Sequence, residues 1–296
     1  MSTHCPPPPD ANQKHQALIV HSSPEIDQLL TNLFDPQEWS LRFVSDNKEA
    51  LRVADAEYFD LILTGERSSG REDVELLRQL RLVRPHIRLI ILADEFTPGD
   101  VIASIREHAF SYFSRPFSTE RLEEFIHIAL TEPCWDDGIE ILSATPNWVR
   151  LSVRCDVLTA NRLMQFYREA SELPDAETEE VSTAFREILL NAMEYGGHFD
   201  PSQYVEVGYV RTKRAIVCRV KDPGEGFSLE EIKHSALSNP PEDPFQHMAT
   251  RESQGKRAGG FGLLMAKKLV DELYFNEKGN EAILIKYLEP AAASAS

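Results

Sequence analysis

The chain has 296 residues, of which 42% are hydrophobic, and this length favours two domains over one. Asp and Glu number 48 against 31 Lys and Arg, so the formal net charge is −17, which argues against general binding to nucleic acid or to an anionic membrane. No apolar run approaches the roughly 20 residues of a membrane-spanning helix, and the N-terminus has no hydrophobic segment typical of a secretory signal.

The two ends of the chain are poor in large apolar residues. The first part contains four consecutive prolines, which is typical of a disordered arm, and the last part is a similar tail. Between them the pattern changes once, where Pro133 and Pro146 bracket a short irregular stretch. The sequence therefore predicts an arm (1–16), a first domain (17–132), a linker (133–146), a second domain (147–288) and a tail (289–296).

The first domain alternates short apolar runs with segments of helical periodicity. The apolar runs predict buried strands at 17–20, 41–44, 61–64, 87–92 and 111–113. Apolar residues three and four positions apart predict helices at 25–34, 47–56, 72–83, 98–110 and 121–130. Because strands that alternate with helices form a parallel sheet, we expect an α/β fold with a doubly wound, five-stranded parallel sheet and helices on both faces.

This order of elements resembles the receiver domain of two-component response regulators. Pro24, Asp60 and the Arg115-Pro116-Phe117 segment add to the resemblance, which covers the whole first domain. The resemblance implies a cis peptide bond between Arg115 and Pro116.

The residues on which receiver chemistry depends are absent from the matching positions. Receivers hold magnesium with an acidic pair after the first strand, where this chain has His21-Ser22-Ser23, and they phosphorylate an aspartate after the third strand, where it has Gly65. Their hydroxyl residue and lysine match Ala93 and Arg115. Aspartyl phosphorylation needs a carboxylate beside a divalent cation. The resemblance therefore implies a pseudo-receiver for docking or dimerisation, with about residues 98–130 as its candidate surface.

Glu66 and Asp94 are the nearest substitutes for the missing carboxylates. Each lies one residue beyond the strand end at which the acceptor is required. A carboxylate in a surface loop is usually only solvated, so we favour that interpretation for both.

The second domain has a different order of elements. Strands are predicted at 148–154, 204–211, 215–222, 273–276 and 281–288, and helices at 158–171, about 176–194 and 262–273. A long polar stretch precedes the last helix. This order predicts an α/β sandwich, in which one helical layer packs on one mixed sheet.

Glu187 and Asn191 lie four residues apart on the long predicted helix, so they project from one face. A carboxamide oxygen can bind a hard cation such as Mg²⁺, and a neighbouring carboxylate can take a proton. Together they suit a magnesium–phosphate site. Taken alone, such a pair is more often the exposed polar face of a helix.

Two glycine-containing segments follow. Asp222 comes directly after a strand, where its carboxylate can accept a hydrogen bond from an exocyclic amine such as that of adenine, and Gly224 and Gly226 let the backbone approach a flat ring. Residues 259–262 (Gly-Gly-Phe-Gly) open a helix, whose N-terminal N–H groups suit phosphate. A plain turn and a flexible linker are the alternatives, and the turn at 279–282 is structural by default.

In this order, the Glu-x-x-x-Asn helix, the Asp-x-Gly-x-Gly turn, the Gly-x-Gly turn and the final strand resemble the GHKL ATPase domain. Within that superfamily, FREILLNAMEYG and GGFGLLMAKKLVDELYFNEKGNEAILIKYL resemble the anti-sigma-factor serine kinases of bacterial partner switching. The resemblance spans about 147–288 and implies a fold that binds ATP and Mg²⁺.

The resemblance implies a role for each candidate residue. Glu187 is the general base for the acceptor hydroxyl, Asn191 holds Mg²⁺, and Asp222 accepts a hydrogen bond from the adenine amine. The remaining implied nucleotide contacts are glycines, with Gly224 and Gly226 at the base and Gly260 and Gly262 at the phosphates.

The chain departs from the family at two places. Residues 228–258 match a lid that is short in these kinases and carries an arginine just ahead of the Gly-x-Gly turn. Here the lid is long, and Lys256 and Arg257 lie near that position, where they either contact phosphate or are solvated surface charges. The final strand has Ala282 or Ile283 where the family often has a threonine.

The favoured function is an ATP- and Mg²⁺-dependent serine/threonine protein kinase of partner switching, which phosphorylates a STAS-type anti-anti-sigma protein and binds a sigma factor. The alternative is a nucleotide-binding partner switch without phosphoryl transfer, and the presence of Glu187 favours the kinase. Gly65 disfavours a phosphorylation-driven response regulator, and the short junction disfavours a histidine kinase.

The expected environment follows from cysteine usage and charge. The four cysteines form no CxxC pair, which indicates reduced thiols in the cytoplasm. We expect no direct nucleic-acid or membrane partner, and a homodimer stays open.

Overall fold

The computed structural model describes residues 14–65, 67–94, 97–131, 137–171, 173–226 and 262–288. The chain divides into two compact units, Met1–Asp137 and Gly138–Ser296. The predicted tail and the whole of the predicted lid lie outside the described residues, as does most of the predicted arm.

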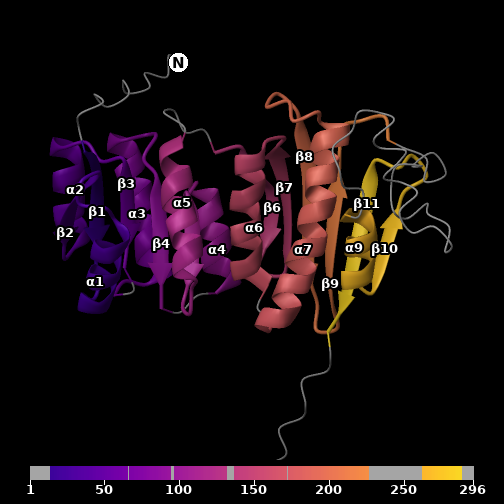
Figure 1. The fold of residues 1–296 in the computed structure, drawn as a ribbon, viewed down its shortest axis with the longest axis horizontal. Helices are drawn as coiled ribbons and strands as arrows, with labels where there is room; N and C mark the ends of the chain where they lie inside the picture. The colour runs from indigo at the N-terminus through magenta and orange to yellow at the C-terminus, as the bar shows by residue number, and fades with distance from the viewer. Residues whose placement is uncertain are drawn as a thin grey trace, which may run out of the picture. The chain divides into compact units, whose positions relative to one another are not determined.

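The first unit contains the predicted parallel sheet. Its strands pair in the order β2-β1-β3-β4-β5, and every pairing is parallel (Figure 1). This is the order of a doubly wound sheet in which the chain reverses direction beside the first strand. The strands are β1 (His15–Val20), β2 (Trp39–Val44), β3 (Leu61–Thr64), β4 (Leu89–Ala93) and β5 (Ser111–Ser114). Since β1 begins at His15, the predicted arm is two residues too long.

Five helices connect and follow these strands. Side-chain caps explain where several of them begin: Ser69 with Glu72, and Thr97 with Asp100, form reciprocal capping boxes. The fourth helix ends earlier than predicted, and two residues later His108 adopts a left-handed φ of 60°. The helices are α1 (Pro24–Leu33), α2 (Asn47–Ala56), α3 (Gly70–Val83), α4 (Pro98–Arg106) and α5 (Thr119–Thr131).

Helices cover both faces of this sheet, as predicted. On one face, Ile19 and Leu63 of the strands form a core with Leu30 of α1 and Phe125 of α5. Because side chains alternate along a strand, neighbours such as Ile62 point to the opposite face, where α2 contacts α3 and α3 contacts α4. The buried strands therefore read as continuous apolar runs.

The second unit contains one sheet of six strands in the order β10-β11-β9-β8-β7-β6 (Figure 1). All five pairings are antiparallel, so the predicted mixed sheet is wrong. The strands are β6 (Ile139–Thr145), β7 (Trp148–Arg154), β8 (Tyr204–Arg211), β9 (Ala215–Lys221), β10 (Glu272–Phe275) and β11 (Glu281–Tyr287).

Strand β6 corrects the predicted linker. Residues 139–145 pair with β7 along their length, with a register shift between Ile141 and Ser143. They are an edge strand that needs only one partner, and the irregularity interrupts the alternation by which a strand is recognised. The second unit accordingly begins at Gly138 rather than at residue 147.

The helical layer of the second unit packs on one face of its sheet. Alternate residues of β9 are buried, among them Cys218 and Val220, and α7 contacts α6, α9, β9 and β11. The long predicted helix continues past its α-helical part as a π-helix. The elements are α6 (Val157–Ser171), α7 (Asp175–Asn191), the π-helix η1 (Ala192–Gly196) and α9 (Gly262–Leu269). Within the described residues, none of the helices combines the length and apolar character needed to cross a bilayer.

Candidate functional site

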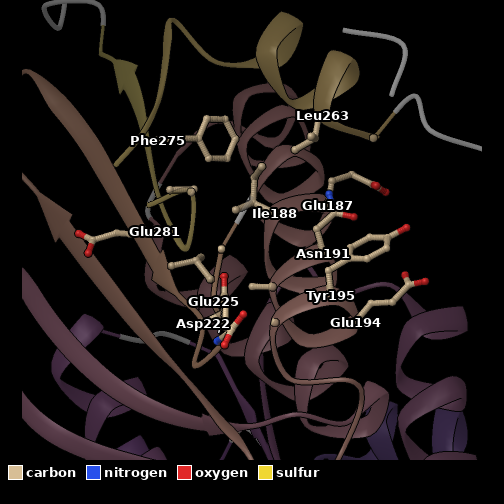
Figure 2. A pocket seen from close by; sticks show the side chains of 18 of the residues that line it. Glu187, Ile188, Asn191, Glu194, Tyr195, Asp222, Glu225, Leu263, Phe275 and Glu281 are labelled. Carbon is tan, nitrogen blue, oxygen red and sulfur yellow. Dashed lines mark hydrogen bonds between the residues drawn. The ribbon is translucent and has the colours of Figure 1, made fainter. Parts of the chain in front are cut away.

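The end of α7 supplies one wall of a cavity. Glu187 and Asn191 lie one turn apart on α7, and Tyr195 lies four residues further on in η1. In η1 the N–H of Gly197 donates to the carbonyl of Ala192, five residues earlier, at 3.0 Å. This wider turn packs more residues into each revolution than an α-helix does. Four polar side chains from this segment border the cavity: Glu187, Asn191, Glu194 and Tyr195 (Figure 2).

The loop after β9 supplies the opposite wall. Oδ1 of Asp222 accepts a hydrogen bond from the N–H of Gly224 at 2.8 Å, which fixes the turn. The carboxyl is half-buried, and desolvation raises the pKa of Asp222 above its ordinary value, although the Gly224 N–H opposes the shift. The carboxylate is thus a partly dehydrated hydrogen-bond acceptor beside the cavity.

Close backbone approach explains two glycines at this site. A side chain at Gly196, the last residue of η1, would collide with the Asp222 carboxylate. A side chain at Gly262, the first residue of α9, would collide with Oε2 of Glu187. Gly196 needs glycine, because a side chain there would also meet Cβ of Asp222, whereas at Gly262 only the end of the Glu187 side chain would have to move.

The cavity measures about 640 Å³, within the range of small-molecule sites. Leu263 and Phe275 lie at one end of the cavity, Asp222 and Glu225 lie at the other, and Ile188 lies between them (Figure 2). Its walls come from three regions that are far apart in the sequence, within residues 187–198, 220–226 and 262–282. The lining residues are Glu187, Ile188, Asn191, Ala192, Glu194, Tyr195, Gly196, His198, Val220, Asp222, Gly224, Glu225, Gly226, Gly262, Leu263, Phe275, Gly279, Glu281 and Ala282.

The structure brings most of the sequence-predicted residues together. Six of them border this one cavity: Glu187, Asn191, Asp222, Gly224, Gly226 and Gly262. The other three, Lys256, Arg257 and Gly260, lie outside the described residues.

Sequence reasoning missed other residues of the wall. Tyr195 continues the four-residue spacing of Glu187 and Asn191, which was a usable signal. Phe275 gave none, because a single aromatic residue in a short strand normally belongs to a core.

The charge of the cavity is strongly negative. Five carboxylates line it, from Glu187, Glu194, Asp222, Glu225 and Glu281, and no Lys or Arg is found among its described lining residues. Of these, Glu281 is paired with Arg219, whose Nε lies 2.7 Å from its Oε1. An anionic ligand would therefore need added positive charge.

In the first unit, the position that matches the phosphate-accepting aspartate of receivers has no room for a side chain, because backbone fills the space. A side chain at Gly65 would collide with the Cα of Ser22, which belongs to the loop after β1. Asp94 is exposed, with Oδ1 3.9 Å from Nε of Arg115, and Glu66 lies outside the described residues. The Arg115–Pro116 bond is cis, as predicted.

The carboxyl of Asp73 is buried against the segment that follows β3. Oγ of Ser68 lies 2.6 Å from Oδ1 of Asp73 and 3.0 Å from the carbonyl of Gly65, so its single proton has an acceptor on either side. Burial raises the pKa of Asp73 to about 7, and the hydrogen bond from Ser68 only partly offsets the effect.

Comparison with known proteins identifies both units. Residues 17–127 match the response regulator receiver domain, and residues 153–286 match the histidine kinase-like ATPase domain. The chain joins a receiver domain to a GHKL-like ATPase domain. The receiver domain occupies the first unit, and the ATPase domain contains the cavity.

Each curated relative matches only part of this chain. The serine-protein kinase RsbW of Oceanobacillus iheyensis is 28% identical over 111 residues, which are 37% of this chain and 65% of that protein. The transcriptional regulatory protein GlrR of Escherichia coli K12 is 25% identical over 140 residues, 45% of this chain and 31% of that protein. The chain thus spans less than two thirds of these curated relatives.

Among solved structures, a CheY-like receiver domain protein from Methanospirillum hungatei covers 41% of this chain and 97% of its own, with 21% identity and a TM-score of 0.38.

Proposed function

We propose that the ATPase domain is a serine/threonine protein kinase that binds ATP with Mg²⁺. The observation that carries the proposal is the convergence of Glu187, Asn191 and Asp222, with three glycines, around one cavity. These residue types come from α7, the loop after β9 and the start of α9. Each residue type is a weak signal alone, but a binding site for a nucleoside triphosphate requires all of them around one cavity.

The base of the nucleotide is assigned to the end of the cavity near Asp222. The half-buried carboxylate accepts a hydrogen bond from the exocyclic amine of adenine, and Ile188 offers apolar contact to the ring. Loss of a hydrogen bond to a charged group typically costs about 1.5–3 kcal/mol, so Asp222 would dominate selection of the base.

The donor set fits Mg²⁺ bound together with phosphates. No group of three or more His, Cys, Asp or Glu that could hold a metal ion was found in the described part of the chain. Mg²⁺ is typically held by one or two protein oxygens together with substrate phosphates, and Asn191 supplies such an oxygen. The bound ion would supply the positive charge that the described lining lacks.

Catalysis in this proposal is positioning followed by proton removal. Glu187 takes the proton of a serine or threonine hydroxyl as that oxygen attacks the γ-phosphorus of ATP, and ADP leaves. Its carboxylate is held against the start of α9, where the helix N-terminus favours negative charge. Gly262 allows this approach.

The proposed partners are a STAS-type anti-anti-sigma protein as phosphoryl acceptor and a sigma factor as the regulated protein. Similarity to the serine-protein kinase RsbW supports this choice. We propose that the protein acts in the cytoplasm without direct contact to nucleic acid. Homodimerisation is open to test.

The receiver domain is proposed to dock or dimerise without being phosphorylated, through the α4–β5–α5 face. Support comes from Gly65, where the backbone of Ser22 occupies the space that an acceptor side chain would need. Labelling of the intact protein by acetyl phosphate at an aspartate of this domain would contradict the proposal.

A second candidate is a nucleotide-dependent partner switch without phosphoryl transfer. It is favoured by Ala282, which lines the cavity without a hydroxyl where the family often has a threonine. The two candidates share ATP binding and differ in the need for Glu187.

The test of function is transfer of labelled phosphate from ATP to a candidate antagonist protein. We expect labelling by the wild type, none without Mg²⁺, and a fall of at least about 100-fold for Glu187→Ala. Glu194→Ala, at the same cavity wall, serves as the matched control. Equal labelling by the wild type and Glu187→Ala would refute the mechanism, and nucleotide binding with no labelling would favour the switch.

A further inference from the structure

The turn between β10 and β11 lies directly against the loop that carries Asp222. Gly226 has a left-handed φ of 85°, and a side chain there would collide with the carbonyl oxygen of Lys278. Nζ of Lys278 donates to the carbonyl of Gly224 at 3.0 Å. The sequence treats this turn as structural only, but the two segments meet backbone to backbone at the wall of the cavity.

Asn280 is at the centre of this contact. It is 6% exposed, and its Nδ2 donates to the carbonyl of Asp222 at 3.3 Å and lies 3.5 Å from the carbonyl of Gly224. Its own carbonyl accepts the N–H of Asp222 at 3.0 Å. One residue therefore binds both peptide groups of Asp222.

Asn276 fixes the orientation of the Asn280 amide. Nδ2 of Asn276 donates to Oδ1 of Asn280 at 2.9 Å, and Oδ1 of Asn276 accepts the N–H of Asn280 at 3.1 Å. With Oδ1 of Asn280 already bonded, its Nδ2 must face the Asp222 loop. The two asparagines act as a clamp in which each hydrogen-bonding group has a defined partner.

The clamp acts on the residue whose placement matters most for base recognition. The carboxylate of Asp222 is held on one side by the N–H of Gly224. The clamp restrains the backbone of Asp222, because Asn280 binds both its N–H and its carbonyl. A binding group must stay within about 0.5 Å of its productive position, and loss of the clamp frees the backbone that sets that position.

We propose that Asn280 is a positioning residue for nucleotide recognition, which holds Asp222 where it can bind the exocyclic amine of the base. The inference rests on the proposed function, because it presumes that the cavity binds an adenine nucleotide. It assigns to the β10–β11 turn a part in ligand selectivity that a structural turn does not have.

The test compares two ligands in the full-length protein by calorimetry. One is ADP, and the other is the purine riboside diphosphate that carries hydrogen in place of the 6-amino group. We expect the wild type to prefer ADP by about tenfold or more, the worth of one hydrogen bond to a charged group. In Asn280→Ala the preference should fall to about twofold or less, while a general loss of stability would weaken both ligands alike.

Two further variants keep the test decisive. Asn280→Asp has the same shape but no N–H₂ donor, so it should also lose the preference even where the alanine variant folds poorly. Thr212→Ala removes a comparable clamp from the β8–β9 turn, where Oγ1 accepts the N–H of Ala215 at 2.9 Å. That turn is at the opposite end of β9 from Asp222, so the control should keep the wild-type preference.

The outcomes separate this inference from the proposed function. A wild type that binds ADP with amine selectivity, and variants at Asn280 that keep the same selectivity, would overturn the positioning role alone. A wild type that binds neither ligand would overturn both.

Discussion

Asp73 of the receiver domain gives the sharpest quantitative prediction, through the substitution Asp73→Asn. Its side chain is fully buried, and burial raises its pKa from 3.8 to about 7. The folded protein therefore keeps the proton up to about pH 7, whereas the unfolded chain releases it near pH 4. The stability that this group contributes is greatest in acid and is lost as the pH rises toward 7.

The magnitude follows from the size of the pKa shift. Each pKa unit corresponds to about 1.4 kcal/mol, so the shift of Asp73 amounts to about 4 kcal/mol over its whole range. Between about pH 5 and pH 8 the wild type should lose about 3 kcal/mol of this, because the unfolded chain has already released the proton that the folded group keeps until about pH 7, and the loss should level off above that pH. Asparagine keeps the acceptor for Ser68 and does not titrate, so Asp73→Asn should lack this loss.

Hydrogen exchange of the intact protein measures the effect in the correct domain. Amides of β3 and β4 report the free energy of unfolding of the receiver domain at each pH. Glu75→Gln, an exposed acid on the same helix, should follow the wild type. Parallel pH profiles for the wild type and Asp73→Asn would refute the argument that burial controls this carboxyl.

Four further predictions concern the ligand site, the receiver domain and its core. Gly196→Ala should weaken ADP binding in calorimetry by at least about tenfold, because the new methyl group meets the carboxylate of Asp222. Since burial raises the pKa of Asp222, ADP affinity should fall in acid at a pH above the ordinary aspartate range, and Asp222→Asn should remove that dependence. In the receiver domain, Gly65→Asp should not restore labelling by acetyl phosphate, because the backbone of Ser22 fills the space that the new side chain would need. Leu30→Ala in α1 should lower the free energy of unfolding by about 2–5 kcal/mol in urea titrations, because Leu30 is buried in the core.

Strong local periodicity made most of the fold predictable. All five receiver strands were expected within a few residues, and the signal is plainest in β3 and β4, because a strand buried on both faces is an uninterrupted apolar run. Strand β6 was missed because one of its edges is unpaired and its register shifts at Ile141, so neither signal of a buried strand is present. The antiparallel pairing of the second sheet depends on long-range contacts that sequence spacing does not report.

The candidate site was predictable where chemistry and spacing coincide. Glu187 and Asn191 share a helix face by arithmetic, and Asp222 stands at the end of a clear strand. The parts that Gly196 and Asn280 play at the site were not predictable, because their importance comes from packing against Asp222, a contact between segments far apart in the chain.

The edge position of β6 has a practical consequence for anyone who wishes to produce the ATPase domain separately. A fragment cut at residue 147 would strip away the neighbour of β7 and leave the hydrogen-bonding groups of Trp148–Arg154 open to other chains. A fragment that starts at Gly138 would retain this protection and stay dispersed at concentrations where the shorter one precipitates.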